Sequence, residues 1–275
     1  MTAKIQSDLP ISVLLRAWIG IECLFGILSI LSISLSPTET KTNFAWPIMP
    51  PTTAALLGGF YLAAASFYVL SFFARRWENI RVFIWASILF STIELIATFL
   101  HWDRFSVGSL PFNVWFVSYI LPAPLFIAFY FWHQRRAAPI PKSTDEPLPD
   151  SLRLGMRVLG AVIALFALAA FIVPASIIPL MPWTFSPLTL RALSGWILAL
   201  GVMNLTAAHE NDRTRVRIIS PFFVLLLPCV LLEIARYPQA VNFARPAIWV
   251  GLAVMTVIFA IGVYLIRGDW RKTMR

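Results

Sequence analysis

Long apolar stretches alternate with short polar segments along most of this chain. Eight of these stretches reach the roughly 20 mostly apolar residues that a helix needs to cross a bilayer. They are too long for membrane strands and lack alternation with period two, so they predict helices rather than a barrel. The predicted spans are Ile11–Leu35, Thr53–Ala74, Val82–His101, Asn113–Trp132, Val158–Ile178, Leu188–His209, Ile218–Arg236 and Ala247–Ile266.

Composition supports this class of fold. Hydrophobic residues make up 59% of the 275 residues and charged residues 13%, against about 25% charged in an ordinary soluble domain. A water-soluble domain of this length could not bury so much apolar surface. We therefore expect an all-α membrane protein with membrane lipids as its surroundings.

The net charge of +9 raises the question of a nucleic-acid surface. If the N-terminus is cytoplasmic, 17 of the 22 Lys and Arg residues fall in the inner segments. Such a bias orients a multi-pass protein with its basic side in the cytoplasm. The charge thus predicts topology, with both termini cytoplasmic and no nucleic-acid partner. The five outer basic residues are Lys41, Arg104, Arg191, Arg236 and Arg245.

One long polar segment divides the spans into two sets of four. Residues 134–157 are rich in proline and charge, which is typical of an extended linker. This predicts a first four-helix module over residues 1–133, a cytoplasmic linker over 134–157, and a second four-helix module over 158–275.

The two modules share a short pattern at an offset of 136 residues. It pairs Pro51 with Pro187, Thr53 with Thr189, Leu57 with Leu193 and Gly59 with Gly195. The ordered matches indicate an internal duplication. Because each module has an even number of spans, both enter the membrane from the same side and form a parallel repeat. Small residues at helical spacing in the pattern favour close helix packing over a ligand contact.

Motifs for catalysis or metal binding are missing from the sequence. The histidines His101, His133 and His209 form no HExxH or HxxxH pattern, and there is no G-x-S-x-G motif or P-loop. Cys23 and Cys229 lie within spans, where apolar packing is the simpler interpretation. We therefore expect no metal, no cofactor and no catalytic residues.

Acidic residues inside spans are the stronger functional signal, because buried charge is costly in a membrane. Glu22 lies in the first span, Glu94 in the outer half of the third and Glu233 near the outer end of the seventh. Under the repeat offset Glu94 corresponds to Val230, so the two outer glutamates differ by one helical turn.

Further charged residues gather at the same outer rim: His101, Asp103 and Arg104 end the third span, Arg236 ends the seventh, Arg191 opens the sixth and Arg245 precedes the eighth. In one interpretation, Glu94 and Glu233 pair with arginines such as Arg191 and Arg236 and hold the bundle together. In the other, the cluster lines a pocket that opens outward. The structural interpretation is preferred because rim arginines could reach both acids without a cavity.

One segment of the second module resembles a sequence pattern of uncharacterised multi-pass bacterial membrane proteins. This segment reads Trp183-x-x-x-Pro187-Leu-Thr-x-Arg191-Ala-Leu-Ser-Gly195-Trp196. The first module has Ala55 in place of Arg191. The resemblance implies a bacterial plasma-membrane protein and no particular activity.

Three functions remain open from the sequence. The leading one is a non-enzymatic membrane subunit or a binder of lipid or a small ligand, with a protein partner or a second copy possible. A small transporter that uses the outer-half glutamates is the alternative, and a lipid-modifying enzyme is the third. The absence of evident broken helices weakens the transporter, and the absence of a catalytic set weakens the enzyme.

Topology can be tested with single cysteines placed at Ser143 and Ser106 in a chain that lacks Cys23 and Cys229. The charge bias predicts that, in intact cells, an impermeant thiol reagent labels position 106 and leaves position 143 protected. Equal labelling of the two positions would contradict the eight-span arrangement.

Overall fold

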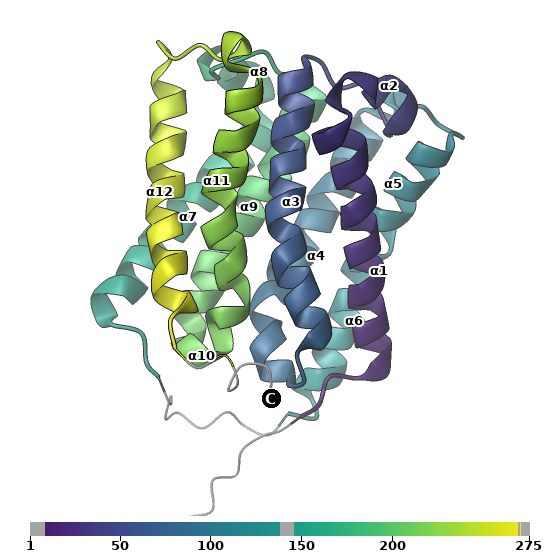
Figure 1. The fold of residues 1–275 in the computed structure, drawn as a ribbon. Helices are drawn as coiled ribbons and strands as arrows, with labels where there is room; N and C mark the ends of the chain where they lie inside the picture. Colours follow the sequence, from purple (N-terminus) through teal and green to yellow (C-terminus); the bar gives the residue numbers. More distant parts are fainter. Residues whose placement is uncertain (1–8, 138–145, 269, 271–275) are drawn as a thin grey trace, which may run out of the picture.

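The computed structural model describes residues 9–137, 146–268 and 270 (Figure 1). Over these residues the fold is helical, with eight helices long and apolar enough to cross a membrane, as the hydrophobic pattern predicts. The middle of the predicted linker, including Ser143, lies outside the described residues. The spans are Val13–Leu35, Pro51–Phe73, Trp77–Leu100, Leu110–Gln134, Asp150–Ile172, Pro187–Glu210, Arg213–Arg236 and Pro246–Ile266.

Five of these spans are dominated by one long helix, and short helical turns occupy several connections. The long helices are α3 (Pro51–Phe73), α4 (Trp77–Leu100), α7 (Asp150–Ile172), α9 (Pro187–Glu210) and α12 (Pro246–Ile266). The seventh span joins α10 (Arg213–Val216), η5 (Arg217–Ile219) and α11 (Ser220–Arg236). The remaining short elements are η2 (Pro37–Glu39), α2 (Thr40–Asn43), η3 (Trp102–Arg104), α8 (Pro174–Ile177), η4 (Ile178–Leu180) and η6 (Pro238–Ala240).

Proline and serine explain where the central helices begin. Pro51 and Pro187 occupy the first turns of α3 and α9, where a missing N–H costs nothing and the fixed φ suits a helix. The Ser186 side chain accepts a hydrogen bond from the Thr189 backbone N–H at 3.1 Å, which satisfies one of the free donors of the first turn. The proline of the shared pattern therefore stands at the start of a central helix in each half of the chain.

Two spans that the sequence predicts as continuous helices are irregular. The fourth span consists of α5 (Leu110–Ile120) and α6 (Pro122–Gln134), interrupted at Leu121. Pro122 explains the break, because it lacks an N–H and its ring crowds the carbonyl one turn earlier. The first span begins as α1 (Val13–Ser29) and ends as a π-helical segment, η1 (Ile30–Leu35).

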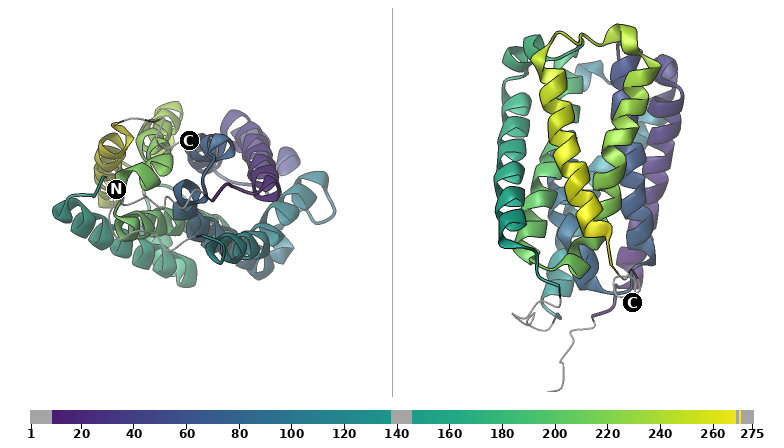
Figure 2. Two further views of the ribbon diagram at one scale, coloured as in Figure 1. Left: turned by 90° about the horizontal axis from the view of Figure 1, so that it is seen from below. Right: turned by 60° about the vertical axis from the view of Figure 1, so that its left-hand side comes forward.

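Four helices form the centre of the bundle and the other spans flank them. The central contacts join α3 to α11 and α4 to α9. Outside them, α1 packs on α3, α6 on α4, α7 on α9 and α12 on α11, an arrangement that can be followed in Figures 1 and 2. The flanking spans are accordingly much less buried than the central ones.

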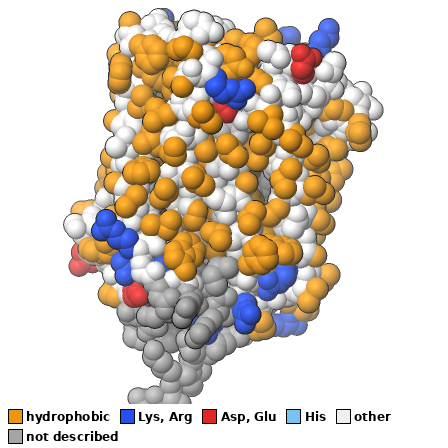
Figure 3. All heavy atoms as spheres, viewed as in Figure 1, with side chains coloured by type: hydrophobic (Ala, Val, Ile, Leu, Met, Phe, Trp, Pro, Cys, Tyr) orange, Lys and Arg blue, Asp and Glu red, His pale blue; other side chains and the backbone are white. Residues whose placement is uncertain are grey.

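Exchanging the two halves maps the α3–α11 contact onto the α9–α4 contact. A parallel duplication would produce this pairing, so the contacts support the repeat, which stays a prediction. The surface agrees with a membrane setting, since apolar side chains cover the middle of the visible face and most charges lie towards its ends (Figure 3).

The two glycines that the 136-residue offset pairs, Gly59 and Gly195, occupy close contacts, as the small-residue pattern predicts. A Cβ on Gly59 would meet the Glu233 side chain at 3.4 Å. A Cβ on Gly195 would lie only 2.5 Å from the Glu94 carboxylate. Each glycine on a central helix of one half therefore faces a glutamate on a central helix of the other half.

Leucine at Gly195 should destabilise the bundle, because its side chain would push α9 away from α4. Overpacking of this kind costs about 1–3 kcal/mol. Gly251 in α12 is the matched control, since an added Cβ there has no neighbour within 4 Å. Thermal unfolding in one detergent should rank Gly195→Leu well below Gly251→Leu, and equal midpoints would contradict the packing role.

Candidate functional site

Near the C-terminal end of α11, Glu233 forms the ion pair that the sequence predicts. Its side chain is 1% exposed. Arg236 Nη1 donates to one carboxylate oxygen at 2.6 Å, and Ser34 Oγ donates to the other at 2.8 Å. Arg236 also donates to the Ser34 carbonyl at 2.6 Å. The acid is thus fully engaged in joining α11 to the irregular end of the first span, which is a structural role.

His101 and Arg191 contact each other rather than an acid. Arg191 donates from Nη1 to His101 Nε2 at 2.6 Å and from Nε to the Phe171 carbonyl at 2.9 Å. Partial burial lowers the pKa of His101, and the positive charge of Arg191 lowers it further. A neutral imidazole that accepts from the guanidinium fits both observations.

Asp103 stands apart from the predicted cluster. It pairs at 3.2 Å with its neighbour Arg104, and both side chains are more than 70% exposed. An exposed pair of this kind contributes little to stability. The six predicted residues therefore separate into a Glu233–Arg236 pair, a His101–Arg191 contact, an exposed Asp103 and an isolated Glu94.

Glu94 differs from the expectation that an arginine or His101 would neutralise it. Its side chain is 1% exposed, and neither carboxylate oxygen has a hydrogen-bond partner among the described residues. The helical register explains the difference: three residues after Glu233 comes Arg236, whereas three residues after Glu94 comes Ala97. The one-turn offset between the halves thus leaves one glutamate paired and the other without a cation.

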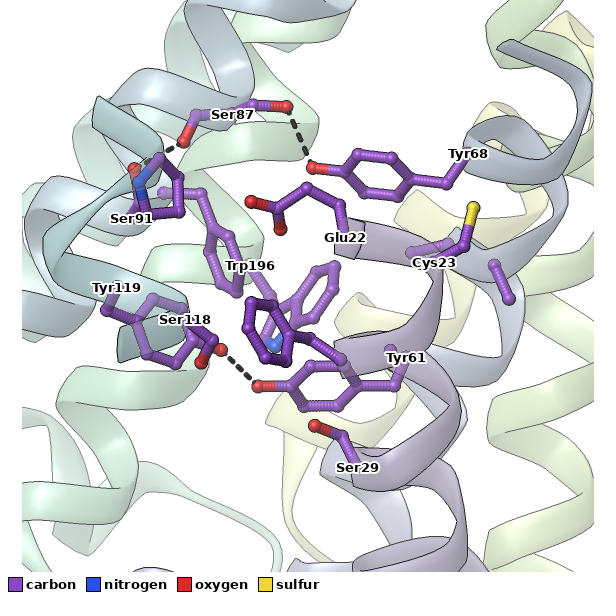
Figure 4. Close-up of a pocket in the computed structure, with 16 residues that line it drawn as sticks. Glu22, Cys23, Ser29, Tyr61, Tyr68, Ser87, Ser91, Ser118, Tyr119 and Trp196 are labelled. Atoms are coloured by element: carbon purple, nitrogen blue, oxygen red, sulfur yellow. Dashed lines mark hydrogen bonds between the residues drawn. The ribbon is translucent and has the colours of Figure 1, made fainter. Parts of the chain in front are cut away.

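A pocket inside the first half was not predicted from the sequence (Figure 4). It lies between α1, α3, α4 and the broken fourth span, and α9 contributes one wall through Trp196. We call it the Glu22 pocket. Its lining residues are Glu22, Cys23, Phe25, Gly26, Ser29, Tyr61, Ala64, Ala65, Tyr68, Ser87, Phe90, Ser91, Ser118, Tyr119, Pro122 and Trp196.

Glu22 supplies the only carboxylate among these lining residues. Figure 4 shows its side chain leaving α1 and reaching into the pocket, with the Tyr68 hydroxyl nearby. The Oε1 atom of Glu22 is buried and has no hydrogen-bond partner among the described residues. A buried acceptor of this kind is costly unless a ligand, a water or a proton satisfies it.

Hydroxyl groups make up the rest of the polar lining. The Tyr68 and Ser87 hydroxyls are 3.1 Å apart, and the Tyr61 and Tyr119 hydroxyls hydrogen-bond each other. Both pairs connect α3 to another span, and Figure 4 shows them on the same side of α1 as Glu22. The pocket thus offers several hydroxyls that can donate or accept beside one carboxylate.

The pocket is narrow. It encloses about 550 Å³ of space, part of which is open to the surroundings, and only about 40 Å³ can hold the centres of water-sized molecules. One water needs roughly 10–15 Å³ measured in this way. A few waters or a compact ion fit without rearrangement, whereas a lipid headgroup does not.

A smaller chamber adjoins the pocket on the side of Glu94. We call it the Glu94 chamber, and about 10 Å³ of it can hold the centre of a water-sized molecule. It shares the walls formed by Tyr61 and Trp196 with the Glu22 pocket. Its lining residues are Ile33, Phe44, Trp46, Leu57, Tyr61, Glu94, Trp115, Ala192 and Trp196.

A sequence signal for the Glu22 pocket was present. Glu22 and Ser29 are seven residues apart in one span, Tyr61 and Tyr68 are seven apart in the next, and Ser87 and Ser91 are four apart in the third. Each spacing places both residues on one helix face. The sequence does not show that these three faces meet.

The described residues contain no group of three or more His, Cys, Asp or Glu side chains that could hold a metal ion. Comparison of the chain with protein-family models, curated proteins and solved structures found no match. The functional argument therefore depends on the geometry of the chain's own residues.

Alanine at Glu233 should lower the free energy of unfolding, because Arg236 would lose its counter-charge. The loss should be about 1–3 kcal/mol, below the range for fully buried pairs, since the Arg236 side chain is 33% exposed. Replacing both residues by leucine should recover most of the stability. Chemical unfolding would measure the free energy of unfolding of both variants, with Glu39→Ala at an exposed site as the control. If Glu233→Ala had the same free energy of unfolding as the unaltered protein, the ion pair would have no role in stability.

Proposed function

We propose that this protein is a polytopic membrane protein that binds a small ligand in the Glu22 pocket. The eight apolar helices indicate a membrane protein. The observation that carries the binding proposal is the buried Glu22 Oε1 atom, which lines a pocket with several hydroxyls and has no hydrogen-bond partner among the described residues. A bacterial plasma-membrane location with both termini cytoplasmic is part of the same proposal, supported by the distribution of basic residues.

The pocket chemistry favours a compact cation with hydrogen-bond donors. A carboxylate supplies the opposite charge, and the Tyr68 and Ser87 hydroxyls can accept further hydrogen bonds. The Trp196 ring adds an aromatic wall that suits a cation. The small volume restricts the ligand to the size of an ammonium, a methylammonium or a hydrated proton.

A transporter is the second candidate, and the helix geometry favours it. The break between α5 and α6 places Pro122 in the pocket wall, and the first span turns π-helical directly after Ser29, another wall residue. Interrupted helices that line a binding site near the middle of the membrane are typical of transporters. Uptake of labelled methylammonium into proteoliposomes would favour this candidate over a binder without transport.

Ammonium should stabilise the protein against heat, because a ligand that binds only the folded state shifts unfolding in proportion to its occupancy. Tetramethylammonium chloride at equal ionic strength is the control ligand, since it carries the same charge but has no donor and is too large. The difference between the two salts should vanish in Glu22→Gln and persist in Glu39→Gln, which alters an exposed glutamate. If ammonium raised the unfolding temperature of Glu22→Gln as much as that of the unaltered protein, the proposal would be wrong.

A further inference from the structure

Glu94 is the most isolated acidic group in the part of the chain that the structure describes. Its carboxylate is buried in the Glu94 chamber with no hydrogen-bond partner. The bundle also leaves space for this carboxylate. Position 195 on α9 is a glycine, and a Cβ there would lie only 2.5 Å from Glu94 Oε1. A carboxylate that is buried in apolar surroundings without a partner must carry a proton or exchange one with its surroundings.

Among the residues that the structure describes, no basic side chain pairs with this carboxylate. On α9, Arg191 is engaged by His101 and the Phe171 carbonyl. On α4, Thr98 is engaged by the Glu94 carbonyl and by the Trp115 indole. The titratable side chain that lines the chamber beside Glu94 is Tyr61 from α3, and its hydroxyl hydrogen-bonds that of Tyr119 from α5.

Tyr61 lies at the boundary between the cavities of the two glutamates. It lines both the Glu22 pocket and the Glu94 chamber. Its hydroxyl hydrogen-bonds that of Tyr119, which also lines the pocket. The pair is thus the polar element in a partition that is otherwise formed by the Trp196 ring.

Aromatic rings close the chamber on its outer side. Phe44, Trp46 and Trp115 line it, and the Trp46 ring packs edge-on against that of Trp115 with centroids 4.7 Å apart. These rings bring indole N–H groups but no hydroxyl to the chamber, and among its lining residues only Tyr61 carries a hydroxyl that can both accept and donate a proton.

We infer that Glu94 is a second protonation site, which exchanges protons with the Glu22 pocket through the hydroxyls of Tyr61 and Tyr119 and one water in the Glu94 chamber, which has room for a water-sized molecule beside the carboxylate. The inference rests on the proposed pocket, because that pocket supplies the waters or the cation that donate the proton. As a proton passes, each tyrosine oxygen and the water oxygen accepts one proton and releases one of its own. Neither tyrosine ends charged, and Glu94 becomes a neutral carboxylic acid.

The exchange can be followed by infrared spectroscopy of the full-length protein in lipid. A protonated carboxyl group gives a C=O stretching band that shifts when its proton is replaced by deuterium. We expect one such band to disappear in Glu94→Gln and to move, rather than disappear, in Glu94→Asp. After transfer to D₂O, the Glu94 band should shift about tenfold more slowly in Tyr61→Phe and in Tyr119→Phe, as expected when a hydrogen-bonded relay group is removed.

Tyr264→Phe is the matched control, because Tyr264 lies in α12 and lines neither cavity. It should leave the exchange rate unchanged. Unaltered exchange in both tyrosine variants, or a spectrum with no band assignable to Glu94, would overturn the inference. Thermal stabilisation by ammonium, measured on the same samples, separates the two proposals. If ammonium still stabilises the protein but the exchange rate is the same in the tyrosine variants, the ligand proposal is supported and the relay is wrong. If the stabilisation is absent while exchange slows as expected, the ligand proposal is wrong and the relay stands.

Discussion

The arrangement of this bundle depends on two crossings at which a glycine of one half faces a glutamate of the other. Gly59 on α3 lies against Glu233 on α11, and Gly195 on α9 lies against Glu94 on α4. Helices in lipid gain little from the hydrophobic effect, so close contact through small residues is what holds them together. The four central helices follow from these crossings, and the flanking spans pack around them.

The two crossings differ in electrostatics although they resemble each other in shape. Glu233 is satisfied by Arg236 and Ser34, so its charge is a permanent part of the structure. Under the 136-residue offset, Glu94 corresponds to a position one helical turn before Glu233, and its carboxylate has no hydrogen-bond partner among the described residues. If the halves arose by duplication, one crossing has kept a structural pair while the other has become free to take up a proton.

The sequence was sufficient to predict the class of the fold, the number of spans and the buried positions of both glycines, because long apolar runs and small-residue spacing are local signals. It was not sufficient for the partner of Glu94, since pairing depends on the rotation of α4 relative to α9. The Glu22 pocket escaped prediction for the same reason: its hydroxyls come from three spans whose facing sides only the packed bundle reveals. Pro122 is visible in the sequence, but the apolar run around it predicts one continuous helix, whereas the structure breaks at Leu121.

We propose that the Glu22 pocket holds a compact ligand on Glu22, while Glu94 has no cation beside it. An experimental structure in native lipids, determined in ammonium chloride, tests this most directly. We expect density for a water or a compact cation within hydrogen-bonding distance of Glu22 Oε1. We also expect the Glu94 side chain to lie against Gly195 with no arginine beside it. A lipid chain in the Glu22 pocket would contradict the ligand site, and an arginine paired with Glu94 would contradict its lack of a cation.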